Sequence, residues 1–163
     1  MSVTTSDLYD AHSGDVTVCD VQFRSFGRID SFAGRCSTVK IYEGFRTLKE
    51  ALEQPGEKRI LVVDGAGSLR FALLGDRMAE LAIRNGWAGA IIFGAVRDSQ
   101  ALASLDFGVK ALGTTARRAL PEVSGLRDIP ITIGGATFHP GDWVYADADA
   151  VLVAGRRLHG PDI

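Results

Sequence analysis

The feature that most constrains the fold is a stretch at residues 75–98, GDRMAELAIRNGWAGAIIFGAVRD. Apolar residues recur at helical spacing over residues 76–85, and the pair Asn85-Gly86 is a common helix end. Residues 88–93 form an uninterrupted apolar run, which is typical of a buried strand. The stretch therefore predicts a helix, a tight turn and a strand.

The lengths of this helix and strand predict where the charged residues at the two ends of the stretch lie. Ten helical residues rise ~15 Å at ~1.5 Å each, and six strand residues rise ~20 Å at ~3.3 Å each. If the strand runs antiparallel to the helix axis, it returns the chain to the level where the helix began. Twenty residues separate Asp76 from Arg97, which suits this path, so we expect Arg97 and Asp98 to lie near Asp76.

These residues suit the binding of a small acid and a cation. Gly75 lets a ligand approach the backbone closely, and the helix start presents N–H groups with partial positive charge. Arg97 has the forked donor geometry that binds a carboxylate or a developing enolate oxygen. Asp98 can hold a divalent cation such as Mg²⁺, which often takes only one or two protein carboxylates. Asp76 can act as a base through a water.

A purely structural interpretation of the same residues stays open. Asp76 is an ordinary residue at a helix start, where its carboxylate binds backbone N–H groups. Arg97 and Asp98 are also compatible with a surface turn whose solvated ion pair contributes little to stability.

The rest of the chain predicts a mixed α/β domain. We expect strands at residues 31–43, 60–63 and 107–113, short helices within residues 45–54 and 99–105, and three short strands joined by turns within residues 131–155. Strand–helix–strand units in the middle and hairpins toward the C-terminus argue against a simple doubly wound sheet. We see no repeat or linker composition, so we expect residues 1–163 to form a single domain.

Composition and charge argue against several classes of protein. Hydrophobic residues make up 46% of the 163 residues, and the formal net charge is −2. No basic field therefore favours nucleic acid or an anionic membrane. The start of the chain has no signal-peptide pattern, and the longest apolar run is too short to span a bilayer. Cys19 and Cys36 form no C-x-x-C motif, so we expect a cytoplasmic protein with reduced thiols.

Other candidate motifs are weaker. The glycine-rich stretch at residues 64–70, DGAGSLR, lacks the third glycine of a dinucleotide fingerprint and the Gly-Lys-Ser of a P-loop, so we interpret it as a turn that shapes the wall of the site. The three histidines are dispersed, which argues against a zinc site. Arg117 and Arg118 are compatible with binding a distal substrate carboxylate or with a solvated loop pair. Turn chemistry accounts best for the acidic residues near the C-terminus, Asp142, Asp147 and Asp149.

The pair Gly75-Asp76, followed after twenty residues by Arg97-Asp98, resembles the signature of the 4-hydroxy-4-methyl-2-oxoglutarate aldolases. These enzymes share a fold with the regulator of ribonuclease activity A group. Nearly the whole chain resembles this family, including FAGRCSTVK, LVVDGAGSLRFALLGD, ALGTTARR and GGATFHPGDWVYADADAVLV. The resemblance implies a single-domain α/β fold, a compact β/β/α sandwich of the swivelling-domain type with mixed sheets. It also implies a homotrimer with sites near subunit interfaces.

The resemblance further implies a role for each site residue. Asp76 orients or deprotonates a water, Arg97 binds the substrate and stabilises an enolate, and Asp98 ligates Mg²⁺ or Mn²⁺. The implied activity is metal-dependent retro-aldol cleavage of 4-hydroxy-4-methyl-2-oxoglutarate-type 2-oxo acids, with oxaloacetate decarboxylation through the same pyruvate enolate. Backbone contacts to the pyruvate part of the substrate are implied for Gly75, Asp76, Arg77 and Met78.

A second function stays open, that of a protein-binding regulator of an RNA-degrading endoribonuclease without catalysis of its own. Aldolase relatives tend to carry a longer C-terminus with an acidic residue for the neighbouring subunit's site, whereas this chain ends GRRLHGPDI, with Asp162. The regulators have a similar short length, but some lack the aspartate that this chain has at Asp98, which favours an enzyme. A menaquinone-pathway methyltransferase is disfavoured, because no adenosylmethionine-type glycine-rich loop followed by an acidic strand end occurs.

Overall fold

The computed structural model describes residues 2–159, so Asp162 lies outside the described residues. The helices are α1 (Thr5–His12), α2 (Arg46–Leu52), α3 (Asp76–Arg84) and α4 (Ser99–Leu102). The strands are β1 (Val16–Val18), β2 (Arg24–Ser25), β3 (Phe32–Lys40), β4 (Ile60–Asp64), β5 (Ala72–Leu74), β6 (Gly89–Val96), β7 (Gly108–Thr114), β8 (Leu126–Arg127), β9 (Ile131–Ile133), β10 (Ala136–Phe138), β11 (Trp143–Ala146) and β12 (Val151–Ala154).

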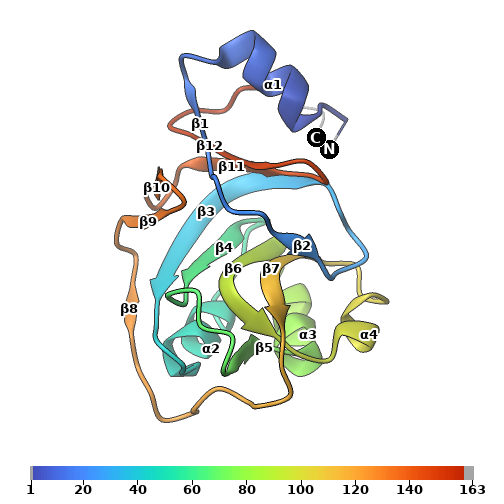
Figure 1. Cartoon of the computed structure of the whole chain (residues 1–163), viewed down its shortest axis with the longest axis vertical. Helices are drawn as coiled ribbons and strands as arrows, with labels where there is room; N and C mark the ends of the chain where they lie inside the picture. The colour runs from blue at the N-terminus through green and yellow to red at the C-terminus, as the bar shows by residue number, and fades with distance from the viewer. Residues whose placement is uncertain (1, 160–163) are drawn as a thin grey trace.

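Helices cover both outer sides of a folded sheet (Figure 1). Within residues 2–159 the strands form one ten-stranded mixed sheet and a separate β9–β10 hairpin. The large sheet has the order β1-β12-β11-β3-β4-β6-β7-β2, with β5 beside β6 and β8 beside β3. Strand β3 belongs to both halves of it, because residues 32–35 pair antiparallel with β11 and residues 36–40 pair parallel with β4. The two halves of the sheet form two layers that meet at β3.

Three hydrophobic cores fill the spaces between the layers of the described residues. Alternate side chains of β4 point to opposite faces of the sheet. Leu61 and Val63 join a helix-side core with α2, α3 and α4, while Ile60 and Val62 join an inter-sheet core with β9 to β12. Tyr145 belongs to an outer core between α1 and the far face of β11 and β12. The expected mixed α/β sandwich is confirmed.

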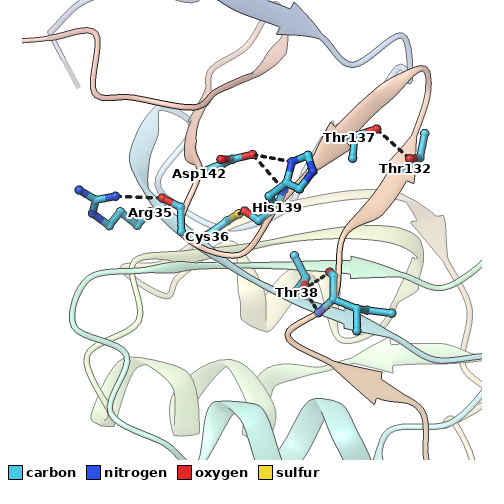
Figure 2. Close-up of polar contacts among 9 residues, drawn as sticks. Arg35, Cys36, Thr38, Thr132, Thr137, His139 and Asp142 are labelled. Carbon is cyan, nitrogen blue, oxygen red and sulfur yellow. Dashed lines mark hydrogen bonds and ion pairs between the residues drawn. The ribbon is translucent and has the colours of Figure 1, made fainter.

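Figure 2 shows how the segment that carries β9 and β10 is joined to β3. The Thr38 hydroxyl donates to the carbonyl of Ile129 at 2.6 Å and accepts from its N–H at 3.1 Å. The Cys36 thiol donates to the carbonyl of His139 at 3.2 Å. Burial raises the pKa of this thiol to about 12, so it remains a protonated donor. Asp142 accepts from the His139 N–H at 2.9 Å and closes the turn before β11, in agreement with its predicted turn chemistry.

Most of the predicted elements are present, as β3, α2, β4, α3, β6, α4 and β7. The C-terminal region holds four strands, β9 to β12, in place of the three expected, because the turns at residues 134–135, 140–141 and 147–149 each join a different pair of strands. The sequence patterns missed α1 and the short strands β1, β2, β5 and β8. Strands of two or three residues are too short to show alternation, and in α1 only Thr5 and Leu8 are buried.

None of the helices within residues 2–159 has both the length and the apolar character that crossing a membrane requires.

One carboxylate anchors the N-terminal helix to the C-terminal part of the chain. Asp147 accepts hydrogen bonds from the N–H and the hydroxyl of Thr5, both at 2.8 Å, and from the N–H groups of Asp149 and Ala150. Partial burial acts to raise the pKa of Asp147. The hydrogen bonds, those from Thr5 first, outweigh burial and lower this pKa below its ordinary value of 3.8. The charged carboxylate therefore holds α1 against the sheet.

We expect Asp147→Asn to lower the free energy of unfolding by about 1–2 kcal/mol at neutral pH, because both carboxylate oxygens accept hydrogen bonds and asparagine keeps only one accepting oxygen. Since the folded pKa is lowered, the stabilisation is present above the ordinary aspartate pKa and is lost as pH falls through the folded value. Urea denaturation from neutral pH to about pH 2 should show the difference between the two proteins shrinking below about pH 4. A difference that stays constant over this range would contradict the anchoring role.

Candidate active site

The candidate site forms where β5 takes the place of β4 beside β6. Strand β4 pairs with β6 as far as Phe93, and β5 pairs with the last residues of β6. Gly75 follows β5 and Arg97 follows β6, so the chain leaves the sheet twice at the same edge. The Arg97 N–H donates to the carbonyl of Leu74 at 3.0 Å, which holds the two strand ends together.

Helix α3 and strand β6 bring the predicted charged residues to one place. The Asp76 N–H donates to Oδ2 of Asp98 at 3.2 Å. The same oxygen lies 3.9 Å from Nε of Arg97. The structure therefore gathers Asp76, Arg97 and Asp98 around the start of α3, where the helix and strand lengths predict them to meet.

Gly75 makes this close arrangement possible because it has no side chain. Its backbone is extended, with φ −132° and ψ −166°, so backbone conformation does not require a glycine here. A Cβ at this position would lie 2.5 Å from Oδ2 of Asp98 and 3.2 Å from Cγ of Arg97. Any larger residue therefore pushes the Asp98 carboxylate away from the start of α3.

Asp98 has a left-handed backbone conformation, with φ 60° and ψ 40°. This conformation costs a residue other than glycine about 1 kcal/mol. Asp98 directly precedes α4, yet its side chain makes no cap there and accepts instead from the first N–H of α3. The strained backbone thus directs the Asp98 carboxylate toward the start of α3. The Asp98 side chain is 38% exposed.

Two carboxylates occupy the start of α3. Asp98 binds the N–H of Asp76, and Oδ1 of Asp76 accepts from the Arg77 N–H at 2.8 Å. The partial positive charge at a helix start stabilises both carboxylates. The N–H groups of Asp76 and Arg77, which the family resemblance implies for substrate binding, therefore already have carboxylate partners within the chain.

Arg97 lies beside the helix start with only weak internal contacts. Its Nη1 lies 3.5 Å from the carbonyl oxygen of Ala116, and its ion pair with Asp98 is loose at 3.9 Å. The Arg97 side chain is 38% exposed, and partly exposed ion pairs of this kind contribute little to stability. The guanidinium can therefore bind a ligand without giving up a strong contact.

One cleft of about 800 Å³ contains all of the predicted site residues in its lining. The same lining includes Phe45 directly before α2, Arg46 at the start of α2, and Arg118 in the segment after β7. Phe45 and Arg46 were not predicted as site residues, because they lie far from the signature and no local sequence pattern marks them. A second hollow of about 490 Å³ shares Arg97 and Asp98 with the cleft. The predicted residues in the cleft lining are Gly75, Asp76, Arg77, Met78, Arg97 and Asp98.

The available donors fit a hard divalent cation held mainly by its ligand and by water. Within residues 2–159 no group of three or more His, Cys, Asp or Glu side chains is arranged to hold a metal. Asp98 presents a partly exposed carboxylate whose Oδ2 is oriented by a backbone N–H, as metal-binding carboxylates commonly are. Mg²⁺ or Mn²⁺ needs no more than one or two such carboxylates when substrate oxygens and waters complete the shell.

The glycine-rich stretch at residues 64–70 has a structural part. The N–H groups of Gly65 and Gly67 both donate to the carbonyl of Phe93, at 3.0 and 3.1 Å. Their donors are therefore not free to bind a phosphate, and the turn they form takes β4 away from β6 where β5 begins. Among the described residues that line the cleft, none comes from this stretch, so the prediction that it shapes the wall of the site is wrong.

Comparison with known proteins assigns the family. The model of the RraA-like family, Aldolase/RraA, matches residues 5–153. The chain belongs to the Aldolase/RraA family. A protein of Alkalilimnicola ehrlichii, provisionally named a 4-hydroxy-4-methyl-2-oxoglutarate aldolase, is 47% identical over 158 residues, which are 97% of this chain and 98% of that protein. A Laribacter hongkongensis protein with the same provisional name is 46% identical over 154 residues, 94% of this chain and 97% of its own length.

Solved structures with the same fold carry other names. The S-adenosylmethionine:2-dimethylmenaquinone methyltransferase from Geobacillus kaustophilus has a TM-score of 0.92 and 43% identity, over 96% of this chain and 97% of that one. The RNA-processing inhibitor RraA from Thermus thermophilus has a TM-score of 0.93 and 36% identity, over 99% of this chain and 98% of that one. These four relatives of the Aldolase/RraA chain thus carry three different functional names.

Gly75→Ala tests whether the Asp98 carboxylate has to stand at the start of α3. The added Cβ displaces the end of a flexible side chain, so we expect the variant to fold with a loss of about 1 kcal/mol, the value of one hydrogen bond. We expect its affinity for Mn²⁺, measured by calorimetry with pyruvate present, to fall about 10-fold or more, because the carboxylate is no longer oriented. Gly113→Ala is the matched control, since a Cβ there meets nothing closer than 3.7 Å. Equal Mn²⁺ affinity in Gly75→Ala and wild type would contradict this assignment.

Proposed function

We propose that this chain is a divalent-metal-dependent aldolase that cleaves 4-hydroxy-4-methyl-2-oxoglutarate-type 2-oxo acids to pyruvate and also decarboxylates oxaloacetate. The observation that carries the proposal is the Asp98 carboxylate, which is oriented by the first N–H of α3 beside the Arg97 guanidinium in a cleft. The full-length similarity to relatives with the corresponding provisional name supports it.

The proposed reaction breaks the bond between C3 and C4 of the substrate. The proton of the C4 hydroxyl goes to Asp76, or to a water that Asp76 orients, and C4 becomes the carbonyl carbon of the second product. The electron pair of the broken bond remains with C3 as a pyruvate enolate, and protonation of C3 then gives pyruvate. A divalent cation bound at Asp98 would supply Lewis-acid polarisation of the 2-oxo group.

Arg97 stabilises the negative charge that develops during this step. Its guanidinium stands beside the helix start and has only weak internal contacts, so its N–H groups can donate to the enolate oxygen or to the adjacent carboxylate. Oxaloacetate decarboxylation uses the same arrangement, because the C3–C4 electron pair again remains on C3 when CO₂ leaves. The two activities therefore depend on the same two residues, Arg97 and Asp98.

We expect pyruvate release from oxaloacetate and from 4-hydroxy-4-methyl-2-oxoglutarate with Mg²⁺ present, and its loss when EDTA is added. Arg97→Ala should lower kcat about 100-fold or more, the usual effect of removing a donor to a developing oxyanion. Asp98→Ala should abolish pyruvate release, and added Mg²⁺ should not restore it. A coupled lactate dehydrogenase assay measures pyruvate, and full activity in EDTA or in either variant would rule out the proposed roles.

We also propose that the enzyme works in the cytoplasm as a homotrimer, as the family resemblance implies. Tyr42 and Leu126 support an assembly, because these large apolar side chains are 59% and 58% exposed, Leu126 pairs with Lys40 at the end of β3 and Tyr42 follows two residues later. Light scattering should then give a mass about three times the 17.4 kDa of one chain. A monomeric mass would contradict this part of the proposal.

A second candidate function is the inhibition of an RNA-processing endoribonuclease. The similarity to the Thermus RraA inhibitor favours it, at 36% identity and a TM-score of 0.93. Adding the purified chain to an endoribonuclease cleavage assay tests it, and inhibition that is unchanged in Asp98→Ala would assign the effect to a protein-binding surface rather than to the cleft. The methyltransferase name of the Geobacillus relative is not carried over, because the N–H groups of Gly65 and Gly67 are bound within the chain.

A further inference from the structure

The segment after β7 runs beside β5 and sends two neighbouring arginines in opposite directions. The Ala72 N–H donates to the carbonyl of Arg117 at 2.7 Å, and the Ala119 N–H donates to the carbonyl of Ala72 at 3.0 Å. These bonds form a parallel bridge between Ala72 and Arg118. Extended backbone points successive side chains to opposite sides. Arg118 accordingly lines the cleft, while Nη1 of Arg117 donates to the carbonyl of Arg70 at 3.0 Å.

The Arg118 guanidinium is held in place by an aromatic ring. It lies over the ring of Phe45, 4.9 Å from the ring centre, which is a favourable cation–π distance. The Phe45 N–H donates to the carbonyl of Leu120 at 3.2 Å, so the ring and the arginine belong to segments that are bonded to each other. Because the ring covers one face of the guanidinium, the N–H groups at its edge remain available for a planar anion.

Arg118 also carries a positive charge that no described carboxylate neutralises. Within residues 2–159 no carboxylate oxygen lies at ion-pair distance from its guanidinium. By contrast, Nζ of Lys49, in the lining of the same cleft, lies 3.9 Å from Oε1 of Glu53. A positioned and unneutralised guanidinium in a cleft is suited to a carboxylate ligand, through paired charge-assisted hydrogen bonds.

The spacing between Arg118 and the Asp98 end of the cleft fits a short dicarboxylate. The Arg118 backbone stands beside Ala72, and three extended residues from Ala72 to Gly75 cover ~10 Å. Arg118 is long enough to shorten this separation with its own side chain. A five-carbon 2-oxo acid with its 2-oxo end near Arg97 and Asp98 would therefore present its second carboxylate to Arg118.

From this placement, we propose that Arg118 binds the distal carboxylate of the substrate and makes the cleft selective for dicarboxylic over monocarboxylic 2-oxo acids. The proposal rests on the proposed function, since it uses the same cleft and the same orientation of the 2-oxo acid. Arg118 then determines substrate specificity, while Arg97 and Asp98 serve the bond-breaking step. Arg117, although adjacent in the sequence, has no part in it.

The sharpest test compares two ligands that differ only at the distal end. 2-Oxoglutarate is the unsubstituted parent of 4-hydroxy-4-methyl-2-oxoglutarate, and 2-oxopentanoate has a methyl group where 2-oxoglutarate has the distal carboxylate. With Mg²⁺ present, calorimetry on the wild type should give about 10- to 100-fold tighter binding of 2-oxoglutarate, as expected for hydrogen bonds between charged groups. Arg118→Gln should bring this ratio close to one, and Arg118→Lys should keep part of it because the charge remains.

Arg117→Gln is the matched control, because it removes the same charge one residue away and outside the cleft; it should keep the wild-type ratio within about twofold. A preference for 2-oxoglutarate that survives in Arg118→Gln would overturn the assignment. So would a wild type without the preference, or an equal loss in Arg117→Gln. If Arg118→Gln binds neither ligand, the Arg118→Lys variant becomes the deciding test. A complete loss of the preference for 2-oxoglutarate in Arg118→Lys would also overturn the assignment.

A second measurement separates this proposal from the proposed function. Exchange of the pyruvate methyl protons in D₂O, followed by NMR with Mg²⁺ present, needs the Arg97–Asp98 end of the cleft and no distal carboxylate. Arg118→Gln should exchange these protons within about twofold of wild type, because Arg118 is placed outside the bond-breaking step. If wild type shows no exchange while its preference for 2-oxoglutarate depends on Arg118, the aldolase proposal fails and the carboxylate site stands. If Arg118→Gln folds but loses the exchange, the specificity role fails.

Discussion

The site depends on a single constraint in the sheet, namely that β4 and β5 share the same side of β6. Strand β7 occupies the other side of β6 along its length, so only one side can change neighbour. The pairing of β4 with β6 ends at Phe93 of β6, whose carbonyl accepts hydrogen bonds from the N–H groups of Gly65 and Gly67. Strand β5 then pairs with the end of β6. Ligands of open α/β sheets bind outside the carboxyl ends of the strands, and the residues after β5 and β6 lie together at that end of the sheet. The glycine-rich turn therefore matters for the site without touching the cleft.

The charges around that point are balanced locally. The start of α3 brings partial positive charge, Asp76 and Asp98 bring two carboxylates to it, and Arg97 adds a cation that neither carboxylate holds tightly. A hard cation with so few protein ligands takes most of its coordination shell from elsewhere. In the proposed enzyme, metal affinity and 2-oxo acid affinity are therefore thermodynamically coupled, and each ligand strengthens the binding of the other.

Local sequence patterns predict only part of this arrangement. The helix at α3 and the strand at β6 follow from spacing and length, and their geometry is enough to bring Asp76 near Asp98. Strand β5 was not predicted, because three apolar residues carry no periodic signal and their pairing with β6 is a long-range event. Local patterns also could not predict that Arg118 lines the cleft while Arg117 lies outside it, since this difference arises from hydrogen bonds to Ala72, far away in the chain. Full-length resemblance supplied the family, which neither spacing nor composition can give.

Strand β3 has a consequence for how the protein opens. One half of this strand pairs antiparallel with β11 and the other half pairs parallel with β4, so a single segment is the seam between the two layers. Separating either layer breaks backbone bonds of the same strand and exposes the inter-sheet core that both layers share. Such a seam prevents the layers from behaving as independent folding units. The amides at the centre of β3 should then be among the slowest to exchange with solvent, because they are released only when the whole molecule unfolds.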